Sequence, residues 1–146
     1  MEAEPVTATV YIDAPPERVY EFFTRPEAIV RWMGEYALLE PESGGQFTVN
    51  VTGAPVRGRF LHVDPPHRLV ISWGYAGSDR LPPGASTVEV HIIADGTGSR
   101  VDLEHRDLPS AEEAGHAIGW THYLARLNEA VADNVGPDPG MGAVPG

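Results

Sequence analysis

The sequence predicts an α+β fold: one strand, two short helices, about six antiparallel strands and a long C-terminal helix, in that order. Between residues 36 and 106, short segments alternate apolar and polar side chains with the period of two expected of strands, and Gly, Pro and Asp turns separate them. Residues 110–135 instead place apolar side chains three and four positions apart, as on one face of a helix. Strands that follow one another, with the helices segregated from them, define the α+β class.

The N-terminal part of the chain predicts a strand followed by two short helices. Residues 6–12 alternate and are rich in β-branched side chains, which is typical of a half-buried strand. Two prolines follow and are acceptable in the first turn of a helix over residues 16–23. Thr24 and Glu27 have the spacing of a capping box, which predicts a second short helix through Trp32.

Six further strands are expected over residues 36–40, 46–52, 56–63, 68–75, 86–94 and 99–106. Their short connections predict antiparallel neighbours. Trp73 and Tyr75 are expected on one face of the fourth of these strands, and Leu103 and His105 on one face of the last. A shift of one residue in register would exchange the faces.

The C-terminal helix is expected to begin at a capping box made by Ser110 and Glu113 and to end at Gly136 and Pro137. Its predicted buried positions are Ala117, Trp120, Leu124, Leu127 and Val131. The opposite, wet face is expected to carry His122, Arg126, Glu129 and Asp133.

Two glycines within this helix are unusual, because glycine costs about 1 kcal/mol relative to alanine in a helix. Gly115 and Gly119 lie one turn apart, so we expect another segment to pack too closely there for a side chain. His116 and Tyr123 fall at the edge of the buried stripe, beside Trp120. Polar groups next to a large buried aromatic are typical of ordinary core packing and also of a ligand cavity.

Composition excludes several classes of function. The 146 residues carry 21 acidic and 10 basic side chains, a net charge of −11, so no basic surface is available for nucleic acid. All basic residues are arginines and cysteine is absent, which excludes lysine Schiff bases, thiol nucleophiles and disulfides. The six histidines form no short metal-binding motif, so neither a metal nor another cofactor is expected.

Length and local composition predict one domain over residues 6–135, followed by a Pro/Gly-rich tail over residues 136–146 that we expect to be disordered. The acidic N-terminus lacks the apolar run of a signal peptide, and no stretch approaches the ~20 apolar residues of a membrane span. A cytoplasmic location is therefore expected.

The order and spacing of several short motifs resemble the SRPBCC superfamily, the START-like or birch-pollen-allergen-like helix-grip fold. The closest branch consists of proteins similar to the C-terminal domain of the heat-shock-protein-90 ATPase activator. The resemblance covers residues 6–135 and rests on residues 14–20, 24–27, Trp32, Gly44-Gly45, Gly58, Asp64-Pro65-Pro66, Trp73, residues 96–98, Gly119-Trp120 and Tyr123-Leu124.

This resemblance implies a curved antiparallel sheet wrapped around the C-terminal helix, with a mostly apolar cavity between them. It implies binding of a small hydrophobic or amphipathic molecule, by a monomer or a homodimer, more than enzyme activity. From strand and helix faces, the expected ligand-binding residues are Trp32, Phe47, Phe60, Trp73, Tyr75, Val90, Leu103, His105, His116, Trp120 and Tyr123.

Two other functions stay open. Similar polyketide cyclases suggest that cavity histidine and tyrosine side chains act as acid and base, with His105 and Tyr123 as the candidate catalytic residues. The named relatives also suggest a chaperone cofactor. That role is less expected, because the few residues before Val6 cannot hold the N-terminal domain of the eukaryotic activator.

Overall fold

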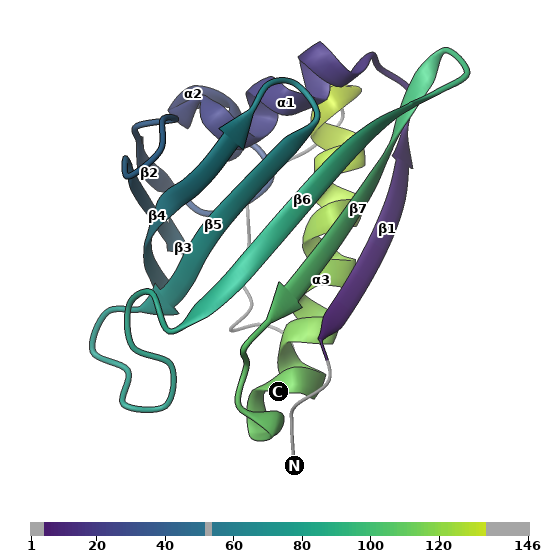
Figure 1. The fold of residues 1–146 in the computed structure, drawn as a ribbon. Coiled ribbons are helices and arrows are strands. Elements are labelled where there is room, and N and C mark those ends of the chain that lie inside the picture. Colours follow the sequence, from purple (N-terminus) through teal and green to yellow (C-terminus); the bar gives the residue numbers. More distant parts are fainter. Residues whose placement is uncertain (1–4, 52–53, 134–146) are drawn as a thin grey trace.

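The computed structural model describes residues 5–51 and 54–133. Strand and helix order follows the prediction, and Figure 1 shows the long helix lying across the concave side of the sheet. The elements are β1 (Val6–Ile12), α1 (Pro16–Thr24), α2 (Pro26–Ile29), β2 (Tyr36–Leu39), β3 (Gln46–Val51), β4 (Ala54–Asp64), β5 (Arg68–Tyr75), β6 (Ser86–Asp95), β7 (Gly98–Arg106) and α3 (Ser110–Val131).

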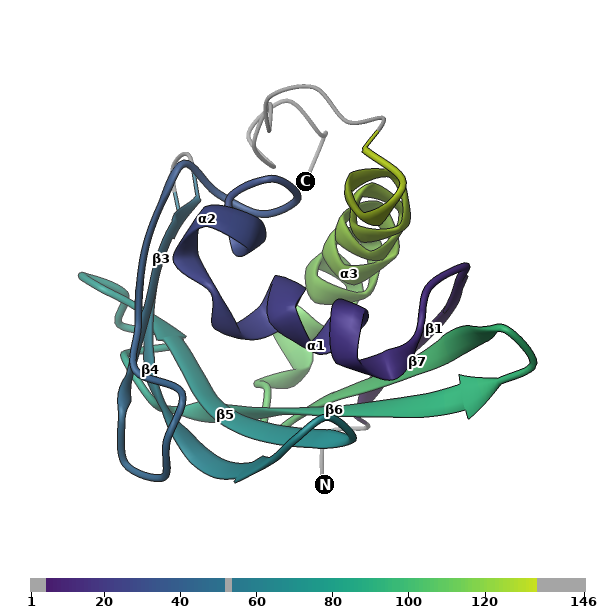
Figure 2. The same ribbon diagram turned by 90° about the horizontal axis from the view of Figure 1, so that it is seen from above.

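The seven strands form one sheet in the order β1-β7-β6-β5-β4-β3-β2, and each neighbouring pair is antiparallel. Hairpin connections join the strands from β2 to β7, whereas β1 pairs with β7 from the far end of the chain. Seen from above, the sheet curves around the three helices (Figure 2). The predicted α+β helix-grip fold is therefore confirmed.

Strand boundaries lie close to the predicted residues, and β1 and β5 begin and end at them. Helices α2 and α3 are shorter than predicted, whereas α1 extends one residue further, to Thr24. Helix α2 ends at Ile29, and tighter turns then carry the chain through Met33 to Gly34, whose φ is +83°. Helix α3 ends at Val131, while the expected stop at Gly136 and Pro137 and the tail 136–146 lie outside the described residues.

Both predicted capping boxes are wrong, and prolines are the reason. Arg25 and Pro109 are the N-cap residues of α2 and α3, and neither helix has a side-chain cap. Pro26 occupies the first turn of α2 and restricts Arg25 to extended backbone, so Thr24 remains the last residue of α1. Pro109 itself has extended backbone, which makes Ser110 the first helical residue.

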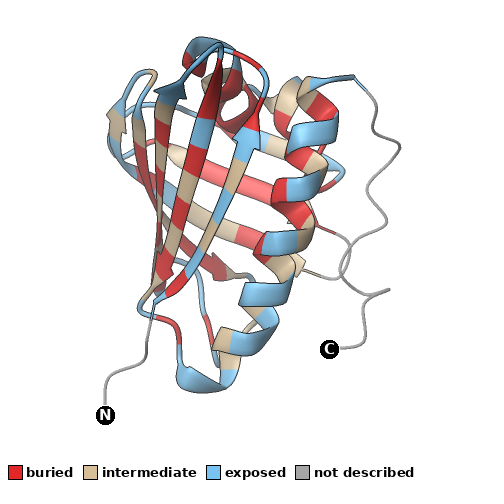
Figure 3. Cartoon of the chain, turned by 90° about the vertical axis from the view of Figure 1, so that its right-hand side faces the viewer, coloured by how far each residue is buried: buried red, intermediate tan, exposed pale blue. Residues whose placement is uncertain are grey.

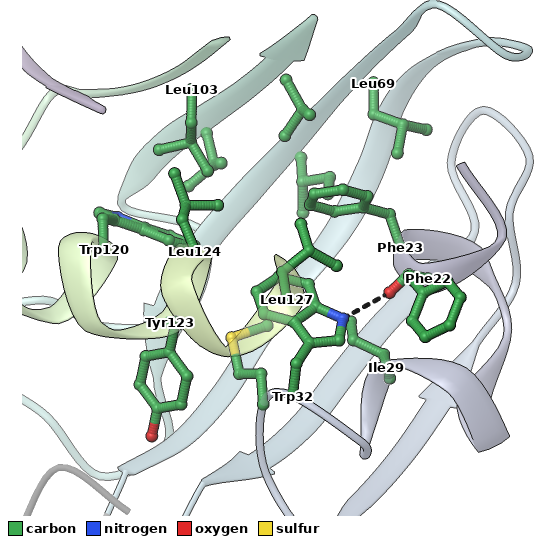
Figure 4. Close-up of a cluster of buried hydrophobic side chains, with 14 of the residues drawn as sticks. Phe22, Phe23, Ile29, Trp32, Leu69, Leu103, Trp120, Tyr123, Leu124 and Leu127 are labelled. Atoms are coloured by element: carbon green, nitrogen blue, oxygen red, sulfur yellow. Dashed lines mark hydrogen bonds between the residues drawn. The ribbon is translucent and has the colours of Figure 1, made fainter. Parts of the chain in front are cut away.

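The core lies between the sheet, α1, α2 and the C-terminal half of α3. Figure 4 shows side chains from these elements converging on Trp32, whose indole Nε1 donates to the Phe22 carbonyl over 2.8 Å. Phe23 meets the Trp32 ring edge-on, with 5.2 Å between centroids, and Leu127 is fully buried beside them. This cluster fills the space between α1 and the end of the sheet that α1 covers.

The buried stripe of α3 consists of Trp120, Tyr123, Leu124, Leu127 and Ala130. It is rotated from the predicted stripe, in which Ala117 was wrongly expected to be buried. Figure 3 shows the first turns of α3 largely exposed. Ala117 is one of the exposed residues. On the predicted wet face, Arg126 is half-buried, because its guanidinium donates to the Trp32 and Arg31 carbonyls.

Candidate functional site

A cavity of about 210 Å³ lies between α3 and the strands β3, β4 and β5. It occupies the part of the concave surface that the Trp32 cluster does not fill. Its apolar walls are Met33, Val51, Ala54, Val56, Trp73 and Trp120. Its polar side chains are Tyr75, Glu112, His116 and Tyr123, and Gly115 and Gly119 complete the helix side.

A directed chain of hydrogen bonds runs along this cavity. The Trp73 indole N–H donates to the Tyr75 hydroxyl over 3.1 Å, and that hydroxyl lies 2.9 Å from His116 Nε2. His116 Nδ1 lies 2.8 Å from the backbone carbonyl of Glu112, which can only accept, so Nδ1 carries the proton. When the ring is neutral, Nε2 accepts from Tyr75. The pair presents a phenol and an imidazole with a defined tautomer to the cavity.

The Tyr75 phenol keeps its proton at neutral pH. Burial raises its pKa above 10.0, the hydrogen bond from Trp73 opposes this rise, and the negative charge of Glu112 adds to it. A protonated phenol is a hydrogen-bond donor. Tyr75 can thus donate either to His116 or to a bound molecule.

His105 lies behind the cavity wall and is fully buried. The Trp120 indole N–H donates to its Nδ1 over 3.0 Å, so the ring proton is on Nε2, 2.7 Å from the Ser86 hydroxyl. Ser86 in turn donates to the Trp73 carbonyl over 2.7 Å. Burial lowers the pKa of His105 to about 3, and the proximity of His116 lowers it further. His105 therefore holds Trp120 in place and has no ring nitrogen facing the cavity.

The predicted ligand-binding residues divide into two groups. Trp73, Tyr75, His116, Trp120 and Tyr123 line the cavity. The others are buried in the core and do not line it: Trp32, Phe47, Phe60, Val90, Leu103 and His105. Of the two candidate catalytic residues, Tyr123 lines the cavity and His105 does not.

Sequence reasoning missed five apolar or acidic lining residues: Met33, Val51, Ala54, Val56 and Glu112. Val51 ends β3 and Val56 is the third residue of β4, and the alternation along these strands was a usable signal. Glu112 precedes His116 by one helical turn, the spacing that places two side chains together. Ala54, the first residue of β4, carried no comparable signal.

The expected close approach at Gly115 is wrong. A Cβ atom added there would meet no atom within 4 Å, and the residue is exposed. Gly115 and half-buried Gly119 instead border the cavity. At Gly115, the missing side chain leaves space open where tight packing was expected.

Within residues 5–51 and 54–133, histidine and carboxylate side chains form no group of three that could hold a metal ion. In the same residues, no helix combines the length and the apolar character needed to cross a membrane.

The family model described as activator of Hsp90 ATPase homolog 1-like protein (AHSA1) matches residues 13–132. The chain belongs to this family. An AHSA1-like protein from Rhizobium etli, whose solution structure is known, confirms the predicted resemblance. Its sequence is 50% identical to this chain, and the two structures match with a TM-score of 0.76. That similarity covers 94% of this chain and 88% of the other.

Two further solved structures place this AHSA1-like chain among its relatives. CalU16 from Micromonospora echinospora is 30% identical, with a TM-score of 0.74, over 91% of this chain and 77% of that one. An HSP90 activator from Plasmodium falciparum shares the fold at 22% identity, with a TM-score of 0.71, over 88% and 96% of the two chains. No curated protein matches the chain significantly.

Proposed function

We propose that this AHSA1-like chain binds a small, mainly apolar molecule with one polar end, in the cavity between α3 and β3–β5. The observation that carries the proposal is the cavity itself, in which apolar walls surround the hydrogen-bonded pair of Tyr75 and His116. Apolar lining with a few convergent polar groups is typical of small-molecule sites.

The cavity size limits the ligand. Sites for drug-sized molecules typically enclose roughly 300 to 1,000 Å³, so about 210 Å³ favours a compact molecule. Burial of its apolar surface contributes roughly 25 cal/mol per Å², less the cost of association. Trp73 and Trp120, whose ring centroids are 5.2 Å apart, supply the largest flat surfaces for it.

The three tryptophans provide an internal test by NMR. Titration of 4-phenylbutan-1-ol should shift the indole N–H signals of Trp73 and Trp120, which line the cavity. The Trp32 indole, bonded to Phe22 in the core, should shift far less. Equal shifts of all three signals, or none at saturating probe, would contradict the proposal.

A pair of helix variants then locates the site. Gly115→Leu places a side chain where the cavity is open and should weaken binding of the alcohol at least tenfold. Ala117→Leu, on the exposed surface of the same helix, is the matched control and should leave the affinity unchanged. Equal affinities of both variants would place the alcohol elsewhere.

The geometry of Tyr75 and His116 favours one alternative, acid–base catalysis. His116 Nε2 would accept a proton from the carbon next to a ketone, while the Tyr75 hydroxyl donates to the ketone oxygen. Deuterium exchange into 4-phenylbutan-2-one in D₂O tests this. The alternative requires accelerated exchange that both Tyr75→Phe and His116→Gln abolish, and exchange at the uncatalysed rate would remove it.

A chaperone partnership is supported only by the description of the family. Stoichiometric, salt-resistant co-purification with Hsp90 would favour it. The NMR titration would then decide whether the cavity has a separate role.

A further inference from the structure

We infer that the polar end of the bound molecule is a cationic ammonium group and not a carboxylate. This inference rests on the proposed function, because it specifies the ligand of the same cavity. Three features support it: the aromatic walls of the cavity, a carboxylate among its described lining residues, and the absence of arginine and lysine from those lining residues.

The aromatic walls favour a cation. Four aromatic side chains line the cavity: Trp73, Tyr75, Trp120 and Tyr123. The faces of such rings carry partial negative charge and attract ammonium groups, by about 0.5–1 kcal/mol at exposed sites and about 2 or more where water is excluded. Trp73 and Trp120 pack against each other with their ring planes inclined by 56°, and both line the cavity.

Glu112 supplies the matching negative charge. It lines the cavity, and 24% of its side chain is exposed, so it is neither deeply buried nor fully solvated. Its partner is Arg80, at 3.5 Å between Nη1 and Oε2, and the Arg80 side chain is 77% exposed. Such a long, exposed ion pair contributes little. An ammonium group in the cavity can therefore share this carboxylate at small cost.

The described residues that line the cavity include no arginine or lysine to pair with an anionic ligand. All basic residues other than histidine are the ten arginines, and none of them lines the cavity. Each arginine pairs with a carboxylate or donates to another group of the protein. Residues 1–4, 52–53 and 134–146 contain no arginine, lysine or histidine. A carboxylate would thus lose its hydration without gaining a positive partner.

The remaining polar groups are compatible with a cation. The one histidine among the described residues that line the cavity, His116, has both ring nitrogens engaged, Nδ1 with the Glu112 carbonyl and Nε2 with the Tyr75 hydroxyl. The N-terminal end of a helix attracts anions, but here Glu112 and Glu113 already occupy the first turn of α3 and offset its positive end.

Three probes with one carbon skeleton separate charge from shape: 4-phenylbutylamine, 4-phenylbutan-1-ol and 4-phenylbutyrate. At pH 7 and 0.15 M salt, the amine should bind at least tenfold more tightly than the alcohol, and the carboxylate more weakly than the alcohol. The salt limits general attraction of cations to a chain with a net charge of −11. Affinities are measured by titration calorimetry, and the indole N–H signals of Trp73 and Trp120 report the site.

Two variants with the same change in net charge test the role of Glu112. Glu112→Gln should reduce the amine-to-alcohol affinity ratio at least fivefold. Glu129→Gln, an exposed position of α3 away from the cavity, should leave the ratio unchanged. Equal effects of the two variants would overturn the inference, because they would show general charge attraction.

The two proposals fail in different ways. If the alcohol shifts the Trp73 and Trp120 signals but the amine binds no better, or the carboxylate binds best, the ammonium preference is overturned and the binding function stands. If none of the three probes binds, both proposals are overturned.

Discussion

The buried His105 predicts a specific dependence of stability on pH. In the folded protein, its pKa of about 3 keeps the ring neutral, whereas the unfolded chain has the ordinary value of 6.5. Below pH 6.5 the unfolded state therefore binds a proton that the folded state does not. Because proton uptake by the unfolded state alone favours unfolding, stability falls as the pH falls from 6.5 towards 3.

The size of this effect follows from the two pKa values. One pKa unit corresponds to about 1.36 kcal/mol, so lowering the pH from 7 to 5 should reduce the free energy of unfolding by about 2 kcal/mol. Glu89, whose pKa is also strongly shifted, contributes little to the change in the free energy of unfolding between pH 7 and pH 5. Burial raises the pKa of Glu89, but hydrogen bonds from Arg68, Arg106 and His91 outweigh this and lower it to about 2. Glu89 thus loses its stabilising effect only as the pH falls below about 4.5.

Urea unfolding followed by tryptophan fluorescence measures the effect at the two pH values. His105→Gln can still donate and accept hydrogen bonds but does not titrate, so its loss between pH 7 and pH 5 should be about 2 kcal/mol smaller than that of the wild type. His62→Gln, at an exposed position, should behave as the wild type. Equal pH dependence in His105→Gln and the wild type would refute the assignment of a neutral, buried His105.

Two further predictions concern packing. Leu127→Ala removes a fully buried side chain and should lower the free energy of unfolding by about 3 kcal/mol; the half-exposed Leu61→Ala should change it by less than about 0.5 kcal/mol in the same urea titration. Gly58→Ala should destabilise the protein, because the new Cβ would overlap the Ser72 carbonyl. Gly115→Ala, where the Cβ meets open space, should raise the melting temperature, because alanine is favoured over glycine in a helix by up to about 1 kcal/mol. A more stable Gly58→Ala or a less stable Gly115→Ala would contradict the surroundings of these glycines.

The order of elements and most strand faces were predictable from the sequence. Alternation placed Trp73 and Tyr75 on one face of β5, and both line the cavity, as expected of residues two positions apart in a strand. The same rule placed Leu103 and His105 on the inner face of β7, where both are buried. A period of two is a local property of extended backbone, so neighbouring residues suffice to read it.

Helix ends and helix faces were less predictable. Ser110 and Thr24 have the chemistry of N-caps, but the prolines at 109 and 26 decided where the helices begin. The buried face of α3 depends on which turns the sheet covers, and Ala117 lies in turns that it leaves exposed. Packing between distant elements is not encoded in the spacing of residues along one helix.

The sequence by itself determined that a curved sheet would hold a long helix with aromatic and polar side chains between them. Only the tertiary structure decided which of those side chains face open space. Phe47 and Phe60 share the concave surface with Trp73 but pack against each other in the core, with 5.5 Å between centroids. A cavity is volume left over when side chains from many elements meet, so it depends on contacts far apart in the chain. The role of His105 likewise depends on a distant element, because α3 places the Trp120 indole within hydrogen-bond distance of its ring.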